Sequence, residues 1–236
     1  MGKIHYAQML LHEFRAALEK MPLAWVPVGL LEWHGEHLPL GTDLIRAEHA
    51  CAAAAAEIGG IVLPGLYTSC KGYGSYEGTV IFNHRTAVTI GLELAAQLQK
   101  IGFKAAFFLS AHGGQYQEAF LEELEKSYTG TMVVRTLPLS RAAKRGDHAG
   151  VSETSDMCLA APELVDLSRL TYPDQHINRY DVPPETLCRG EERPWRWKED
   201  WRDQAGSTIG RENLERVIEH CRRWVEELQL GKDSNR

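Results

Sequence analysis

Acidic and histidine side chains follow directly after a short apolar run near the start of the chain. Residues 24–31 are mainly apolar, and Glu32, His34 and, beyond a loop with glycine and proline, Asp43 come after them. A run this short, closed by turn-forming residues, is typical of a buried strand that enters a loop. If the extended backbone continues, Glu32 and His34 point to the same side and can reach one ion. The loop that follows can fold back and bring the Asp43 carboxylate to the same point. These side chains at a strand end predict a metal site, and the alternative is a solvated polar loop.

A further histidine occupies the same place in a later segment. His112, within AHGGQ, follows the apolar run 105–110. Because ligands of parallel sheets bind beyond the carboxyl ends of the strands, we expect Glu32, His34 and His112 to converge there. The competing interpretation of the glycines is a phosphate-binding loop. The absence of a G-x-G-x-x-G or G-K-[ST] pattern argues against it.

A third polar cluster, GDHAGVSETS at residues 146–155, precedes an apolar stretch at residues 157–165. Ser152 or Thr154 can cap a helix there, which places Glu153 in or near its first turn. The helix dipole favours a carboxylate at that position, so a helix start alone would explain Glu153. His148 lies one loop earlier, where a surface imidazole is the simplest interpretation.

Alternating strands and helices separate these clusters. Apolar runs predict strands at residues 24–31, 61–66, 105–110 and 131–137. Apolar residues at helical spacing predict helices within the first 20 residues and at 44–58, 85–100, 115–127, 157–165 and 212–230. The alternation predicts an α/β fold with a mostly parallel central sheet and helices on both faces. Residues 67–83 form a long loop, and residues 172–210 form an irregular excursion that is either a lid or an interface.

Composition and charge limit the classes of function. With 236 residues the chain suits one domain, residues 1–236. The net charge of −6 and the lack of a dense Lys/Arg run argue against a nucleic-acid partner. No apolar run approaches the roughly 20 residues that a membrane span needs. The N-terminus also lacks a signal-peptide pattern, so we expect a cytoplasmic protein without a membrane partner.

Three motifs of this chain resemble those of the creatininase (creatinine amidohydrolase) family. They are VPVGLLEWHGEHLPLGTD, SAHGGQ, and HAGVSETS with the following APELVDL, and the resemblance covers residues 24–170. It implies a three-layer α/β/α fold, a hydrolytic site with two divalent ions of zinc, manganese or iron, and a homo-oligomer, often a hexamer. Carried over by position, Glu32 and His112 would bind one ion and His34 the other. Asp43 would bridge the two, and such ligands suit these ions.

The chain departs from the family pattern at three positions. The family's type member has a metal-binding glutamate two positions after the histidine that matches His112, whereas this chain has Gly114. Glu153 is the candidate for the missing carboxylate. Lys144 stands where that member has a tryptophan over its substrate, which makes creatinine a poor candidate here. Gln115 replaces an asparagine that is common in the family.

The mechanism expected of two such ions follows from general chemistry. Bound about 3.5 Å apart, two ions can hold a hydroxide and polarise a carbonyl group. His148 is the candidate acid for the leaving group because imidazole titrates near neutral pH. We assign substrate binding to Ser75, Gly113 and Asp147. A serine nucleophile is a poorer interpretation because the sequence has no G-x-S-x-G elbow.

These residues predict a metal-dependent amidohydrolase that cleaves a C–N bond in a small, cyclic molecule. Two alternatives stay open: carbon–carbon hydrolysis of a cyclic keto-polyol, as family members perform in inositol breakdown, and a non-catalytic small-ligand-binding protein of the same fold. Trp195, Trp197 and Trp201 lie among charged residues. Because an exposed aromatic cluster of that size is unusual on a monomer, we expect a homo-oligomer on this ground as well.

Overall fold

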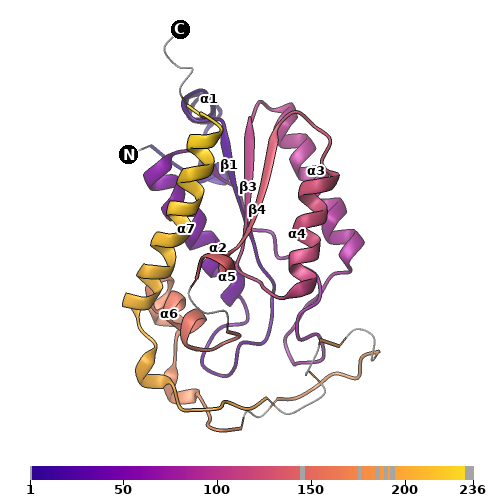
Figure 1. Cartoon of the computed structure of the whole chain (residues 1–236), viewed down its shortest axis with the longest axis vertical. Coiled ribbons are helices and arrows are strands. Elements are labelled where there is room, and N and C mark those ends of the chain that lie inside the picture. The colour runs from indigo at the N-terminus through magenta and orange to yellow at the C-terminus, as the bar shows by residue number, and fades with distance from the viewer. Residues whose placement is uncertain are drawn as a thin grey trace.

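Four parallel strands form the centre of the molecule, in the order β2–β1–β3–β4 (Figure 1). They are β1 (Leu23–Val28), β2 (Ile61–Val62), β3 (Ala105–Ser110) and β4 (Val133–Pro138). The computed structural model describes residues 2–143, 147–174, 177–183, 187–188, 191 and 195–231. β1 and β3 are buried along their whole length, as expected of parallel strands that have helices on both faces.

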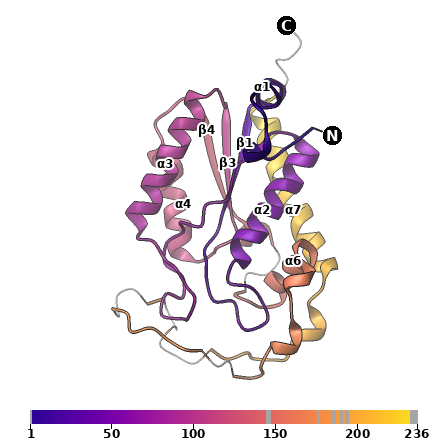
Figure 2. The same ribbon diagram turned by 180° about the vertical axis from the view of Figure 1, so that it is seen from behind.

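Helices cover both faces of this sheet. They are α1 (Leu11–Lys20), α2 (Thr42–Ile58), α3 (His84–Lys100), α4 (Gln115–Ser127), α5 (Leu139–Ala142), α6 (Val151–Ala160) and α7 (Ser207–Glu227). Trp25 and Phe107 pack in one core cluster with α2 and α7, whereas their neighbours Val26 and Phe108 pack in another with α3 and α4. Figures 1 and 2 show the resulting three layers, which confirm the predicted α/β/α architecture. In the described part of the chain, no helix is long and apolar enough to cross a membrane.

The carboxyl ends of three strands lie at one level. Val28 pairs with Ser110, which in turn pairs with Pro138. The segments that follow β1, β3 and β4 therefore leave the sheet from the same edge, at the lower end of the molecule in Figure 1. This register brings together polar residues that are about 80 positions apart in the sequence.

Several element boundaries differ from the predicted ones. The predicted strand 61–66 contains only Ile61–Val62 as regular β structure, since Pro64 has no N–H group to donate. The predicted helix 157–165 is instead α6, which starts earlier and ends before Pro162. The predicted helix 212–230 begins at Ser207, because the N–H of Gly206 donates to Ser155 Oγ (3.0 Å) and starts α7 against α6.

The three tryptophans of the excursion pack inside the chain. Trp195 contacts Trp33 and Trp197, and Trp197 contacts Trp201, with ring centroids 5.2–5.5 Å apart. Trp201 also packs edge-on against His37 (5.4 Å). Trp197 and Trp201 are only 9% and 5% exposed, which confirms that these aromatic side chains are buried. Because the chain itself covers them, their burial gives no support for a second subunit. Figures 1 and 2 show the described parts of this excursion below the carboxyl ends of the strands.

Candidate metal centre

The segment after β1 folds back, so that α2 begins next to the carboxyl end of β1. A Cβ atom on Gly29 would lie 2.5 Å from Leu44 N, so the absence of a side chain allows the start of α2 to sit against β1. Asp43, in the first turn of α2, thereby comes to lie beside Glu32 and His34. All three side chains are at most 1% exposed. Buried charged groups of this kind require partners of opposite charge.

The potential ligand atoms form two sets that share Asp43. One set is Glu32, Asp43 and His112, and the other is His34, Asp43 and Glu153. Asp43 Oδ2 lies 3.1 Å from His112 Nδ1, while Asp43 Oδ1 lies 3.3 Å from His34 Nε2. Each oxygen of the Asp43 carboxylate thus faces a different histidine, so Asp43 belongs to both sets. A third, overlapping set is Glu32, His34 and His148.

His34 shows that the site suits a cation. Its Nδ1 lies 3.0 Å from the carbonyl oxygen of Glu32, which can only accept, so the ring proton belongs on Nδ1. In the neutral ring the buried Nε2 presents a lone pair, and among the described residues it has no hydrogen-bond partner. It lies 3.3 Å from an oxygen of Asp43 and 3.4 Å from an oxygen of Glu153. Two carboxylates around this nitrogen require positive charge, either a proton on Nε2 or a metal cation among the three groups, and this donor set fits a divalent metal.

The ionisation of these groups leads to the same conclusion. Burial opposes the charged form of His34, but the carboxylates of Asp43 and Glu153 outweigh it and raise the pKa of His34 well above its ordinary value. Burial would likewise raise the pKa of Asp43, yet the two neighbouring histidines hold it well below the usual range. The pKa of Glu153 falls to about 2 because Arg46 and His34 outweigh the effect of burial. The cluster therefore keeps its carboxylates ionised and attracts positive charge.

Arg46 is a part of the site that the sequence analysis missed. It lies on α2 one turn after Asp43 and is 6% exposed. Its Nη1 donates to Glu153 Oε1 (2.7 Å), and its Nη2 donates to Asp156 Oδ2 (2.8 Å). The guanidinium group fixes one oxygen of Glu153 and leaves Oε2 facing His34. An arginine three positions after a candidate ligand on one helix was the only available sequence signal.

The start of α6 is capped differently from the prediction. Gly150 is the N-cap, and neither Ser152 nor Thr154 caps the helix. The carboxylate of Asp147 instead accepts hydrogen bonds from the N–H groups of Ser152 (2.9 Å) and Glu153 (3.3 Å). Glu153 does lie in the first turn, but its carboxylate faces His34. The helix-start explanation is therefore incomplete for Glu153.

His148 lies at the site rather than on the open surface. Its side chain is 16% exposed, and its Nε2 donates to the carbonyl oxygen of Trp33 (2.8 Å). Its ring is 4.4 Å from that of His34 and 4.5 Å from that of Tyr73, measured between centroids. Burial and the neighbouring His34 lower the pKa of His148. The interpretation as a surface imidazole is wrong.

A cavity of about 420 Å³ opens onto these groups. Its lining includes Gly113 and Asp147, two of the three predicted substrate-binding residues. Ser75 is not in the lining, because both its N–H and its hydroxyl group donate to Glu191 Oε1 at 2.6 Å. The structure thus gives Ser75 a role in attaching the excursion to the loop 67–83, contrary to its assignment to substrate binding. Lys144 lies outside the described residues.

Gly72 offers a test of the Glu32 position. A Cβ atom on Gly72 would overlap with Glu32 Oε1 and with Leu30 Cδ2, and the N–H of Tyr73 donates to the same Glu32 oxygen (2.6 Å). We expect Gly72→Ala to displace the Glu32 carboxylate and to weaken metal binding by about 10–100-fold, as the loss of an outer-shell contact does. Metal titration of the purified variant checks this.

Gly41→Ala is the matched control, because a Cβ atom there would meet only Ile45, at 3.8 Å. It should bind metal as the wild type does. Unchanged metal affinity in Gly72→Ala would show that Glu32 does not contribute a ligand or that the loop moves aside at no cost.

Comparison with known proteins agrees with this geometry. The family model described as "Creatininase: Creatinine amidohydrolase" matches residues 7–227. The chain belongs to the creatininase family. Among curated relatives, the creatinine amidohydrolase of Pseudomonas putida is 26% identical over an alignment of 228 residues, and the match covers 83% of this chain and 84% of the relative.

Solved creatininase structures share the fold. One described as "Creatininase Mn" has a TM-score of 0.71 at 22% identity and covers 95% of this chain and 98% of its own. A mutant creatininase described as "Zn-Zn type" has a TM-score of 0.69 at 21% identity and covers 96% and 98%. This chain thus has the creatininase fold, and the names of these two structures refer to manganese and zinc.

Proposed function

We propose that this protein is a metal-dependent hydrolase that cleaves an amide C–N bond in a small, cyclic substrate, with two divalent ions of zinc, manganese or iron. The observation that carries the proposal is the carboxylate of Asp43, whose two oxygens face two separate histidine-containing sets at the floor of one cavity. A closed structural zinc site has four protein ligands around one ion and needs no shared carboxylate.

Each side chain has a distinct role in this proposal. Glu32 and His112 would hold one ion, His34 and Glu153 would hold the other, and Asp43, which belongs to both potential ligand sets, would contribute to both. The bound pair would supply a hydroxide at neutral pH and polarise the substrate carbonyl.

Residues around the ligands complete the catalytic groups. Arg46 orients Glu153 through their 2.7 Å hydrogen bond. His148 would accept on Nδ1 the proton that the attacking water releases and pass it to the leaving nitrogen, while the rings of Tyr73 and Trp195 lie 4.5 and 5.3 Å from its ring and shield it from water on that side. Gly113 and Asp147, in the cavity lining, are placed to contact the substrate.

Metal analysis and a substrate screen test the proposal together. Protein purified without chelator should contain about two ions per chain, as the two-ion mechanism requires. It should also hydrolyse a member of a panel of cyclic amides and formamides. Fewer than one ion per chain, unchanged after addition of Zn²⁺ or Mn²⁺, would contradict the two-metal site. Turnover of cyclic ketones alone would indicate carbon–carbon hydrolysis, and ligand binding without turnover would indicate a non-catalytic protein.

Glu32→Gln and Glu36→Gln form a matched pair for this test. Glu32 is buried at the site, whereas the Glu36 side chain, in the same loop, is 50% exposed. Only the first substitution should remove metal and activity. Creatinine is not the substrate that we propose, because Lys144 stands where the family's type member has its substrate-covering tryptophan.

We also propose a homo-oligomeric, cytoplasmic protein. The hexamer is supported by the family resemblance alone, since the tryptophan cluster is already buried within one chain. Light scattering at micromolar concentration checks the assembly, and a monomeric mass would contradict it.

A further inference from the structure

The guanidinium group of Arg46 joins two helices beside the candidate metal centre. Its Nη1 donates to Glu153 Oε1 (2.7 Å) and, at longer range, to the carbonyl oxygen of Ala111 (3.4 Å). The other edge of the group, Nε and Nη2, donates to a single oxygen of Asp156, Oδ2, at 3.1 and 2.8 Å. Arg46 is on α2 and both carboxylates are on α6, so one planar group links these helices.

The second oxygen of Asp156 is held from a third helix, α7. Asn213, which is 5% exposed, donates through Nδ2 to Asp156 Oδ1 (2.9 Å) and to Ser152 Oγ (3.1 Å). One turn earlier, a Cβ atom on Gly210 would collide with the carbonyl oxygen of Ser155, so only glycine lets α7 lie this close to α6. Figures 1 and 2 show α6 beside the lower part of α7. Each oxygen of the Asp156 carboxylate thus has its own donor, and the group cannot turn without losing a hydrogen bond.

The contact with Arg46 leaves one oxygen of Glu153 for an ion. Arg46 occupies Oε1, whereas Oε2 lies 3.4 Å from His34 Nε2. Oε2 also accepts a hydrogen bond from the N–H of Ala149 (2.8 Å). A carboxylate oxygen has two lone pairs, so this hydrogen bond still leaves one of them for a cation.

The positive charge of Arg46 lies close to the same candidate ion. Its Nη1 is 3.8 Å from Asp43 Oδ1, which is the oxygen that faces His34. Among the described residues, Asp156 is its only carboxylate partner that belongs to none of the potential ligand sets. Without Asp156, Nη1 and Nη2 would be free to take both oxygens of Glu153, since arginine and carboxylate groups favour such two-point pairing. Glu153 would then have no oxygen directed at the ion.

We propose that Asp156 is a positioning residue, which holds Arg46 on one oxygen of Glu153 so that the other oxygen can bind an ion. This inference rests on the proposed two-metal function and concerns only the ion assigned to His34 and Glu153. Asp156 does not line the cavity of about 420 Å³, so it acts through Arg46 and not on the substrate. Loss of an outer-shell partner of this kind weakens metal binding by about 10–100-fold.

Retention of Zn²⁺ at controlled free concentration tests this role. Metal-loaded protein is dialysed against buffers of decreasing free Zn²⁺, and the ions that remain per chain are measured. Asp156→Ala should shift one of the two release steps to a free Zn²⁺ concentration about 10–100-fold higher. The other step should stay in place, because among the described residues Arg46 forms no ion pair with Glu32 of the other set.

Three further variants separate this role from a general effect on the fold. Asp156→Glu keeps a carboxylate and should restore most of the affinity. Asn213→Ala removes only the donor to Asp156 Oδ1, so it should shift the same step by a smaller factor, and it serves as the test if Asp156→Ala does not fold. Glu163→Ala removes an exposed carboxylate just after α6 and should change neither step. Circular dichroism of each loaded variant shows whether it has folded.

A double-mutant cycle shows whether Asp156 acts through the guanidinium group. In an Arg46→Met background this group is absent, so Asp156→Ala should add no further loss of Zn²⁺ affinity. Losses that simply add up in the double variant would mean that Asp156 acts in another way, and they would contradict the proposal.

The inference is overturned if folded Asp156→Ala retains both ions as tightly as the wild type. It is also overturned if both steps shift alike, because a general change in the fold has that effect. A failure of the proposed function looks different. A wild type that retains fewer than two ions overturns the two-metal function together with this inference, whereas a wild type with two ions and no hydrolysis of any amide overturns the function alone.

Discussion

Replacing Asp43 with alanine is expected to remove both metal ions and, with them, all measurable hydrolysis. Among the described residues, the carboxylate of Asp43 is the only group shared by the set with Glu32 and His112 and the set with His34 and Glu153. Without this carboxylate, two divalent cations would lie close together in a buried site with less negative charge to offset their repulsion. The loss of metal affinity should exceed the roughly 10–100-fold that removal of an outer-shell partner causes. Metal analysis and activity of the purified variant give the two readouts.

Asp203→Ala is the control for this substitution, because Asp203 is exposed on the excursion. It should retain two ions and full activity. If Asp43→Ala keeps two ions, Asp43 is not the bridge, and the Glu32, His34 and His148 set becomes the better candidate for the first coordination sphere. A variant that keeps one ion would mean that Asp43 belongs to a single set.

The strand ends explain why much of this centre could be predicted from the sequence. Glu32, His34 and His112 each follow a short apolar run within a few residues. Parallel strands with aligned registers place such residues at one edge, and the pairing of Val28 with Ser110 does so here. The local pattern and the fold class together determined the position of these side chains, without knowledge of any long-range contact.

Contacts between distant segments could not be predicted from the sequence in the same way. Arg46 and Glu153 are 107 residues apart, and their hydrogen bond depends on how α6 docks against α2. His37 is similar: burial lowers its pKa to about 4, and its Nε2 contacts Ala149 and Thr154 on the loop and helix that carry His148 and Glu153. Neither residue stands in a pattern that differs from an ordinary polar loop or helix face.

The tryptophan segment shows a different limit. Sequence composition indicates that large aromatic side chains must be covered, but it does not say by what. In the structure, Trp195 packs against Trp33, which lies between the proposed metal ligands Glu32 and His34 in the sequence. The chain itself covers these tryptophans, so their need for burial does not imply a second subunit. Two residues of the predicted long loop 67–83, Lys71 and Gly72, contact His112 and Glu32.

His148→Ala should separate proton transfer from metal binding. In the proposed mechanism His148 only carries a proton to the leaving group, so the variant should keep two ions per chain while kcat falls by about 10²–10⁴-fold, the usual span for a general acid. The Nε2 of His148 already donates to Trp33 O, which directs Nδ1 towards the metal ligands, 4.0 Å from Glu32 Oε2. Single-turnover kinetics and metal analysis of the same preparation measure both quantities.

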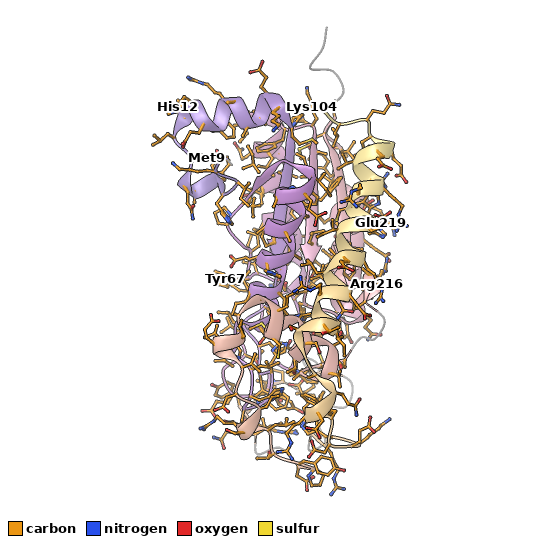
Figure 3. All side chains as sticks on the ribbon, turned by 90° about the vertical axis from the view of Figure 1, so that its left-hand side faces the viewer. Met9, His12, Tyr67, Lys104, Arg216 and Glu219 are labelled. Carbon is orange, nitrogen blue, oxygen red and sulfur yellow. The ribbon has the colours of Figure 1, made fainter. Side chains whose placement is uncertain are left out.

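The geometry of His148 also makes the opposite result meaningful. Since its Nδ1 falls in a potential ligand set with Glu32 and His34, loss of one ion in His148→Ala would make it a ligand and would leave the leaving group without its proposed acid. Full kcat would exclude both roles. His12→Ala, on the exposed side of α1 at the far end of the molecule, controls for the loss of an imidazole (Figure 3).

Because Tyr73 and Trp195 enclose the His148 ring, a smaller side chain there also opens a space that free imidazole can enter. Partial rescue of kcat by added imidazole, at unchanged metal content, is therefore the result expected of a proton donor and not of a ligand.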